Sequence, residues 1–117
     1  MKNIMIVDDS VFMRNLIKKI LRDNNHRVVA EAKNGIQALK KYSDCNPDIV
    51  LLDITMPDMN GLETLKEILR IDPKANIIML SSLGTNYHVT ESLKIGAKDF
   101  IVKPNFENLI PIIAKIS

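Results

Sequence analysis

Short apolar runs alternate with longer amphipathic stretches along the 117 residues of this chain. Five runs rich in Ile, Val and Leu predict strands at residues 3–7, 28–32, 48–53, 76–81 and 100–102. Between the runs, apolar residues recur at intervals of three and four, which predicts helices, most clearly at Met13, Leu16, Ile17, Ile20 and Leu21. Strands that alternate with helices are typical of a parallel sheet covered on both faces. The pattern therefore predicts an α/β fold of five strand–helix units.

Polar residues, glycine and proline mark where we expect the helices to begin and end. Ser10 is a suitable N-cap for the first helix. A turn is expected at Asn34-Gly35, and loops are expected at 56–61 and 82–87. The last helix should lie within residues 107–116, and Pro111 is compatible with it only if Asn108 caps the helix and the proline falls in the first turn.

The composition is that of an ordinary soluble domain. The net charge of +2 is too small to indicate nucleic-acid binding, and the single Cys45 excludes an internal disulfide. No apolar run approaches the length of a membrane span, and the strand pattern begins too early to leave room for a signal peptide. We therefore expect one cytoplasmic domain over residues 1–117 that binds neither membrane nor nucleic acid.

Acidic residues follow two of the expected strands. Asp8 and Asp9 follow the first strand, and Asp53 ends the third. An aspartate after a strand is often only a turn former or a helix cap. If the two strands are neighbours, however, their carboxyl ends open into one crevice, where carboxylates about 4 Å apart repel by about 4 kcal/mol. A group of oxygen ligands of this kind suits Mg²⁺.

A hydroxyl and an ammonium group complete the pattern. Ser81 ends the fourth strand and Lys103 follows the fifth. Phosphoryl transfer to a carboxylate needs a nucleophile, a metal and donors for the phosphoryl oxygens. We interpret Asp53 as the nucleophile, Asp9 as the direct metal ligand with Asp8 acting directly or through water, and Lys103 and Ser81 as the donors. Ser82 is a rival to Ser81, because alternation along a strand exposes only one of them to the crevice.

Four segments resemble the receiver domain of two-component response regulators, and among these the stand-alone chemotaxis receivers of the CheY type. They are Ile6-Val7-Asp8-Asp9-Ser10, the LDITMPDMNG stretch from Leu52 to Gly61, GAKDF from Gly96 to Phe100, and Lys103-Pro104. The resemblance covers nearly the whole chain. It implies a doubly wound, flavodoxin-like (βα)₅ parallel sheet with strand order 2-1-3-4-5, and a single receiver domain without an output domain.

The resemblance also implies a function and roles for individual residues. Asp53 would accept a phosphoryl group from the phosphohistidine of a sensor histidine kinase, with Mg²⁺ held by Asp9, Asp53 and the backbone carbonyl of Thr55 and with Asp8 nearby through water. Ser81 would be the switch hydroxyl and Phe100 the switch aromatic, and the Lys103-Pro104 bond would be cis. The receiver would be a monomeric signalling protein that catalyses only its own phosphorylation and dephosphorylation. Its downstream partner would be a protein such as a flagellar motor switch component, bound by the face of the fourth helix, fifth strand and fifth helix.

Some residues depart from the family's common pattern. Leu83, two residues after Ser81, is apolar and cannot orient a water, so slow self-dephosphorylation is expected. Asn105 stands where many members carry an aromatic residue. Within the family, a receiver excised from a larger regulator, a phosphorelay intermediate and a phosphate sink remain alternatives.

Two further alternatives lie outside the family. A Mg²⁺-dependent phosphohydrolase that forms an aspartyl phosphate would use similar groups, but it commonly carries a second acid where this chain has Thr55. A flavin-binding carrier would need a phosphate-cradling loop after the first strand, where Asp8 and Asp9 would repel phosphate. Both are less consistent with the sequence than a receiver.

Overall fold

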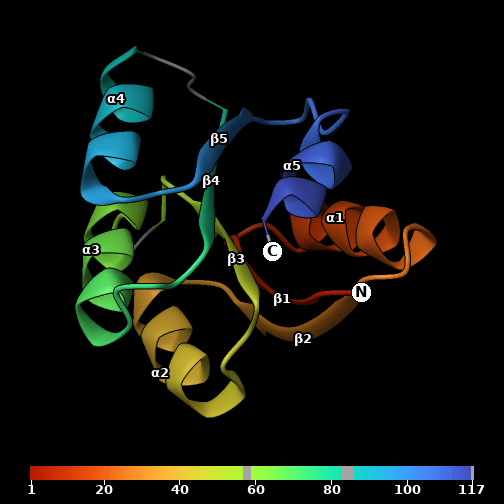
Figure 1. The fold of residues 1–117 in the computed structure, drawn as a ribbon, viewed down its shortest axis with the longest axis horizontal. Helices are drawn as coiled ribbons and strands as arrows, with labels where there is room; N and C mark the ends of the chain where they lie inside the picture. Colours follow the sequence, from red (N-terminus) through yellow and green to blue (C-terminus); the bar gives the residue numbers. More distant parts are fainter. Residues whose placement is uncertain (57–58, 83–85, 117) are drawn as a thin grey trace.

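The computed structural model describes residues 1–56, 59–82 and 86–116, and strands and helices alternate strictly along them (Figure 1). The strands are β1 (Asn3–Val7), β2 (Arg27–Ala32), β3 (Ile49–Asp53), β4 (Ile77–Ser81) and β5 (Asp99–Val102). The helices are α1 (Val11–Asp23), α2 (Gly35–Cys45), α3 (Gly61–Ile71), α4 (Asn86–Ile95) and α5 (Leu109–Lys115). The five predicted strand–helix units are therefore confirmed.

The strands form one parallel sheet in the order β2-β1-β3-β4-β5. This order confirms the doubly wound fold that the sequence predicted. Helices α1 and α5 cover one face of the sheet, and α2, α3 and α4 cover the other (Figure 1). The first and third strands of the chain are direct neighbours, with Ile6 opposite Leu51. Their carboxyl ends consequently meet at the same edge.

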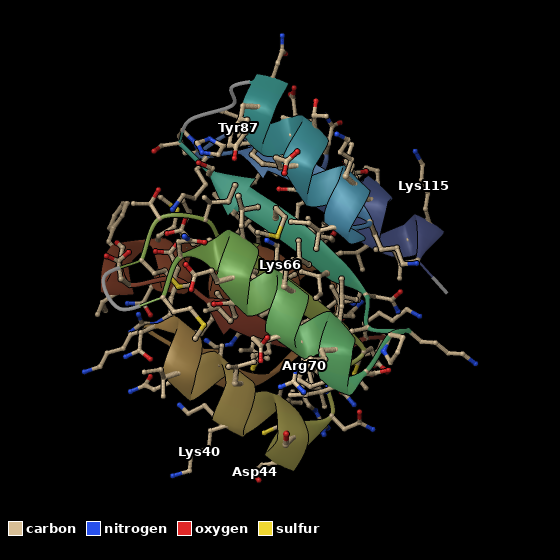
Figure 2. All side chains as sticks on the ribbon, turned by 90° about the vertical axis from the view of Figure 1, so that its left-hand side faces the viewer. Lys40, Asp44, Lys66, Arg70, Tyr87 and Lys115 are labelled. Atoms are coloured by element: carbon tan, nitrogen blue, oxygen red, sulfur yellow. The ribbon has the colours of Figure 1, made fainter. Side chains whose placement is uncertain are left out.

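Alternating strand residues build two hydrophobic layers. Met5 and Leu52 face α2 and α3, whereas Ile6 and Leu51 face α1 and α5. Every residue of β3 and β4 is buried, as expected for central strands of a parallel sheet. Each fully buried Ile or Leu contributes about 1.5–3 kcal/mol, so this core fixes the strand ends firmly. Lysine side chains lie outside it, and Figure 2 shows Lys40 and Lys66 on the exposed sides of α2 and α3.

Several helix boundaries differ from the prediction. Ser10 caps α1 as expected, accepting a hydrogen bond from the Met13 N–H at 3.1 Å. The turn predicted at Asn34-Gly35 was wrong for Gly35, which is already helical. Asn34 lies in a bend before the helix, and its side chain accepts a hydrogen bond from the Gln37 N–H at 2.8 Å. Helix α4 begins at Asn86, inside the predicted 82–87 loop. Residues 83–85 of that loop, including Leu83, lie outside the described residues.

The last helix lies within the predicted span, and Pro111 is its third residue. A proline in the first turn removes no intrahelical hydrogen bond, which explains why it is tolerated. The predicted cap was wrong in one respect, because the Asn108 side chain makes no capping hydrogen bond. The Lys103-Pro104 peptide is cis, as the resemblance implied. Within the described residues, no helix is both long and apolar enough to cross a membrane.

Candidate functional site

Three carboxylates meet at the carboxyl edge of the sheet. Asp8 directly follows β1 and Asp53 is the last residue of β3, so the pairing of these strands brings the two side chains together. One carboxylate oxygen from each of Asp8, Asp9 and Asp53 lies within 4.8 Å of the other two. Asp8 and Asp53 are buried, with exposed fractions of 0% and 3%, whereas Asp9 is exposed. The cluster is thus open to solvent on the side of Asp9.

The ammonium group of Lys103 contacts the two buried carboxylates. Its Nζ lies 2.9 Å from Asp8 Oδ2 and 3.4 Å from Asp53 Oδ1. The backbone N–H of Lys103 donates to the carbonyl of Ser81 at 2.8 Å, which holds the end of β5 beside the end of β4. Burial alone would lower the pKa of Lys103, but the hydrogen bond to Asp8 and the charge of Asp53 raise it. Lys103 is therefore a fixed cation.

The single positive charge of Lys103 does not balance the negative charges of the three carboxylates. Burial raises the pKa of Asp53 to about 6, even though the charge of Lys103 lowers it. The neighbouring Asp8 raises this pKa further, while the Thr55 backbone N–H lowers it by hydrogen bonding to the carboxylate. A divalent cation would remove this conflict, and three hard oxygen ligands at such separations are the donor set that Mg²⁺ prefers. The residues present therefore fit a magnesium ion.

Four hydrogen bonds fix Asp8. Its N–H donates to the Ala32 carbonyl at 3.0 Å, and its Oδ1 accepts from the Ser10 N–H at 2.9 Å. Oδ2 accepts from Lys103, and the backbone carbonyl accepts from Arg14 Nη1 at 2.6 Å. Sequence reasoning missed Arg14. The only available signal was a cation one turn into the helix that follows the acid pair.

The backbone behind Asp53 is held by Gly61. The Gly61 N–H donates to the Ile54 carbonyl at 2.6 Å, which packs the start of α3 against the end of β3. A Cβ at this position would collide with the Asp53 carbonyl oxygen and lie 2.5 Å from the Ile54 Cα. Only glycine permits this approach, so Gly61 is required for the local position of Asp53. The sequence predicted only a loop residue here.

The other predicted site residues differ in exposure and in position. Ser81 is buried at the end of β4, whereas its rival Ser82 is exposed. Thr55 is exposed, two residues beyond Asp53. Phe100 is half-buried in β5, opposite Met79, and packs against the core on the α2–α3 face rather than joining the acidic cluster.

Fold and site together define a class, a doubly wound α/β protein with an acidic cation site and a fixed lysine at the carboxyl edge of its sheet. The response regulator receiver domain matches residues 4–114. This chain belongs to the response regulator receiver domain family.

The most similar relatives include chemotaxis proteins. The chain is 55% identical to "Chemotaxis protein CheY" of Listeria monocytogenes over 104 residues, which cover 89% of this chain and 87% of that protein. It is 52% identical to the CheY protein of Thermotoga maritima, over 88% of this chain and 86% of that protein. The resemblance seen in the sequence is thus confirmed.

Solved structures of similar proteins support the same family assignment. The CheX–CheY–BeF₃–Mg²⁺ complex from Borrelia burgdorferi has a TM-score of 0.93 and 38% identity, covering 97% of this chain and 87% of that chain. The response regulator TrrA from Thermotoga maritima, in complex with Mg²⁺ and BeF, has a TM-score of 0.89 and 36% identity, with each chain covered completely.

Proposed function

We propose that this protein is a phosphorylation-dependent signalling switch of a chemotaxis two-component system. In this proposal Asp53 accepts a phosphoryl group from the phosphohistidine of a sensor histidine kinase. One observation carries the proposal, the convergence of Asp8, Asp9 and Asp53 with Lys103 at the carboxyl edge of a receiver-family sheet. Identity above 50% to CheY proteins supports the chemotaxis role. The protein acts as a cytoplasmic monomer.

In the proposed reaction, a carboxylate oxygen of Asp53 attacks phosphorus, the P–N bond of the phosphohistidine breaks, and the imidazole leaves with the electron pair. Asp9, Asp53 and the backbone carbonyl of Thr55 would hold Mg²⁺, with Asp8 acting directly or through water. When bound, the ion would supply positive charge that offsets the negative charge of the phosphoryl oxygens. Lys103, already 3.4 Å from Asp53, donates to a phosphoryl oxygen. Ser81 supplies a hydroxyl donor from the neighbouring strand.

The signal leaves through the α4–β5–α5 face. A phosphoryl group adds close to two negative charges, and new contacts from Lys103 and Ser81 shift the packing equilibrium of β4 and β5, with Phe100 as the switch aromatic. A surface pocket of about 510 Å³ lies between β5 and α5, with Phe100 and Val102 in its wall. Tyr87 and Leu93 on α4 add exposed apolar surface. This face suits a protein partner, such as a flagellar motor switch component or a CheX-type protein.

Phosphorylation tests the site directly. The protein is incubated with Mg²⁺ and acetyl phosphate, and its intact mass is measured. We expect the mass of one phosphoryl group to be added to wild type and none to Asp53→Asn, with no uptake in EDTA. An unmodified wild type would contradict the proposal, and sustained turnover of small phosphate esters would favour a phosphohydrolase instead.

Partner binding tests the output. The affinity for a purified motor-switch or CheX-type protein is measured with and without Mg²⁺ and beryllofluoride. We expect tighter binding when both are present, because they stabilise the phosphorylated packing. Equal affinity in the two states would contradict a switching role and favour a phosphate sink.

A further inference from the structure

Arg14 connects the acidic site to the edge strand of the sheet. Its Nη1 donates to the backbone carbonyl of Asp8 at 2.6 Å, and its Nε donates to Glu31 Oε1 at 3.1 Å. The guanidinium side chain is only 15% exposed. Arg14 on α1 therefore bridges the residue after β1 and a carboxylate of β2, without contacting the three acidic side chains itself.

Two lysines hold the side chain and the backbone of Glu31 in place. Lys18 Nζ lies 3.0 Å from its second carboxylate oxygen, and Lys41 Nζ donates to its backbone carbonyl. Burial opposes ionisation of Glu31, but the hydrogen bonds from Lys18 and Arg14 outweigh it and hold the pKa of Glu31 below its ordinary value. A charged, anchored Glu31 gives the guanidinium one defined orientation.

The carbonyl that Arg14 binds belongs to the same planar peptide as the N–H of Asp9. Holding this plane restrains the position of the Asp9 N–Cα bond, from which the Asp9 side chain leaves the backbone. The Asp9 carboxylate is exposed, and among the described residues it receives no side-chain or backbone hydrogen bond of its own. Its approach to Asp8 and Asp53 consequently depends on the backbone, and Arg14 is the side chain that holds the carbonyl of the Asp8–Asp9 peptide.

We infer that Arg14, oriented by Glu31, is a positioning residue that preorganises the Asp9 carboxylate for cation binding. This inference rests on the proposed function, because it concerns the same magnesium site. It assigns to Arg14 an indirect role that acts through the Asp8–Asp9 peptide.

Charge alone predicts the opposite effect. A guanidinium near a cation site repels the cation, so removal of Arg14 would strengthen Mg²⁺ binding if only electrostatics mattered. Loss of positioning would weaken binding, and outer-shell partners of metal ligands commonly change affinity by about 10–100-fold. The direction of the change therefore separates the two explanations.

The experiment measures Mg²⁺ affinity by isothermal titration calorimetry. We expect Arg14→Gln and Arg14→Lys each to weaken Mg²⁺ binding about 10-fold or more, and Glu31→Gln to weaken it in the same direction. Lys18→Gln is the matched control, since it also removes a cation from Glu31 but leaves the Asp8 carbonyl bond intact. It should stay within about twofold of wild type. Circular dichroism in EDTA verifies that each variant is folded, and Arg14→Lys keeps the charge if Arg14→Gln unfolds.

Unchanged or tighter Mg²⁺ binding by both Arg14 variants would overturn the inference, as would equal weakening by Lys18→Gln. Phosphorylation by acetyl phosphate gives a second readout. At saturating Mg²⁺, Arg14→Gln should be phosphorylated at close to the wild-type rate, and at low Mg²⁺ it should be slower. If wild type itself binds no Mg²⁺ and takes up no phosphoryl group, the proposed function fails. If wild type does both and the Arg14 variants match it, only the positioning role fails.

Discussion

Replacing Asp53 by Asn should stabilise the metal-free protein. Burial and the adjacent Asp8 raise the pKa of Asp53 from its ordinary value of 3.8 to about 6, despite Lys103. This rise in pKa corresponds to a loss of about 3 kcal/mol in the free energy of unfolding once Asp53 is ionised, since a tenfold change in proton affinity is worth 1.36 kcal/mol. The folded protein therefore loses stability when Asp53 ionises, and a neutral amide of the same shape avoids that loss.

The pH dependence gives the sign of the effect. Between pH 3.8 and about 6 the folded state binds more protons at residue 53 than the unfolded chain does, so the contribution of Asp53 to stability falls as pH rises through this window. The advantage of Asp53→Asn should thus be small at pH 4, grow up to about pH 6.5 and then stay near 3 kcal/mol. Urea unfolding of wild type and Asp53→Asn in EDTA, at pH values from 4 to 8, measures this difference in the free energy of unfolding.

The control for this experiment is Asp44→Asn. Asp44 is exposed on α2 (Figure 2), and its replacement removes the same charge without relieving burial. A stability gain for Asp53→Asn that is absent at pH 8, or equally large at every pH, would refute the reasoning. Mg²⁺ should cancel most of the advantage of Asp53→Asn, because a ligand present at 100 times its Kd stabilises wild type by about 2.7 kcal/mol.

Three further substitutions test single contacts. Gly61→Ala should cost about 2–3 kcal/mol in urea unfolding, since the added methyl group meets the backbone of Asp53 and Ile54; a change below about 0.5 kcal/mol would show that the backbone yields easily. Ser92→Ala should stabilise the protein by about 1–2 kcal/mol, because the Ser92 hydroxyl is buried in α4 and has no hydrogen-bond partner among the described residues. A loss of stability would show that the hydroxyl does make a hydrogen bond. Lys103→Gln should raise the pKa of Asp53 above about 6, as followed by carbon NMR of its carboxyl group, and an unchanged pKa would contradict the role of the Lys103 charge.

The strands and the acidic cluster could be predicted because both depend on local patterns combined with one topological rule. Apolar runs located the strands, and the shared carboxyl edge of adjacent parallel strands placed Asp8 beside Asp53. The helix starts at Gly35 and Asn86 were missed because an Asn-Gly pair and a polar stretch suit a loop and a cap equally well.

The supports of the site could not be read from the sequence, since they join residues far apart in the chain. Arg14 meets Glu31 across 17 positions. Lys103 was placed at the site from the sequence, but its hydrogen bond to Asp8, across 95 positions, was not. The need for glycine at position 61 arises from the approach of α3 to the backbone of β3. Such contacts depend on how the elements pack and leave little trace in local periodicity.

The most direct test of the account locates the phosphoryl group. After phosphorylation with acetyl phosphate and Mg²⁺, borohydride reduction converts an aspartyl phosphate to homoserine, and peptide mass spectrometry identifies its position. The account predicts homoserine at position 53 alone, and only when Mg²⁺ is present. Modification at Asp8 or Asp9, or equal modification in EDTA, would contradict it.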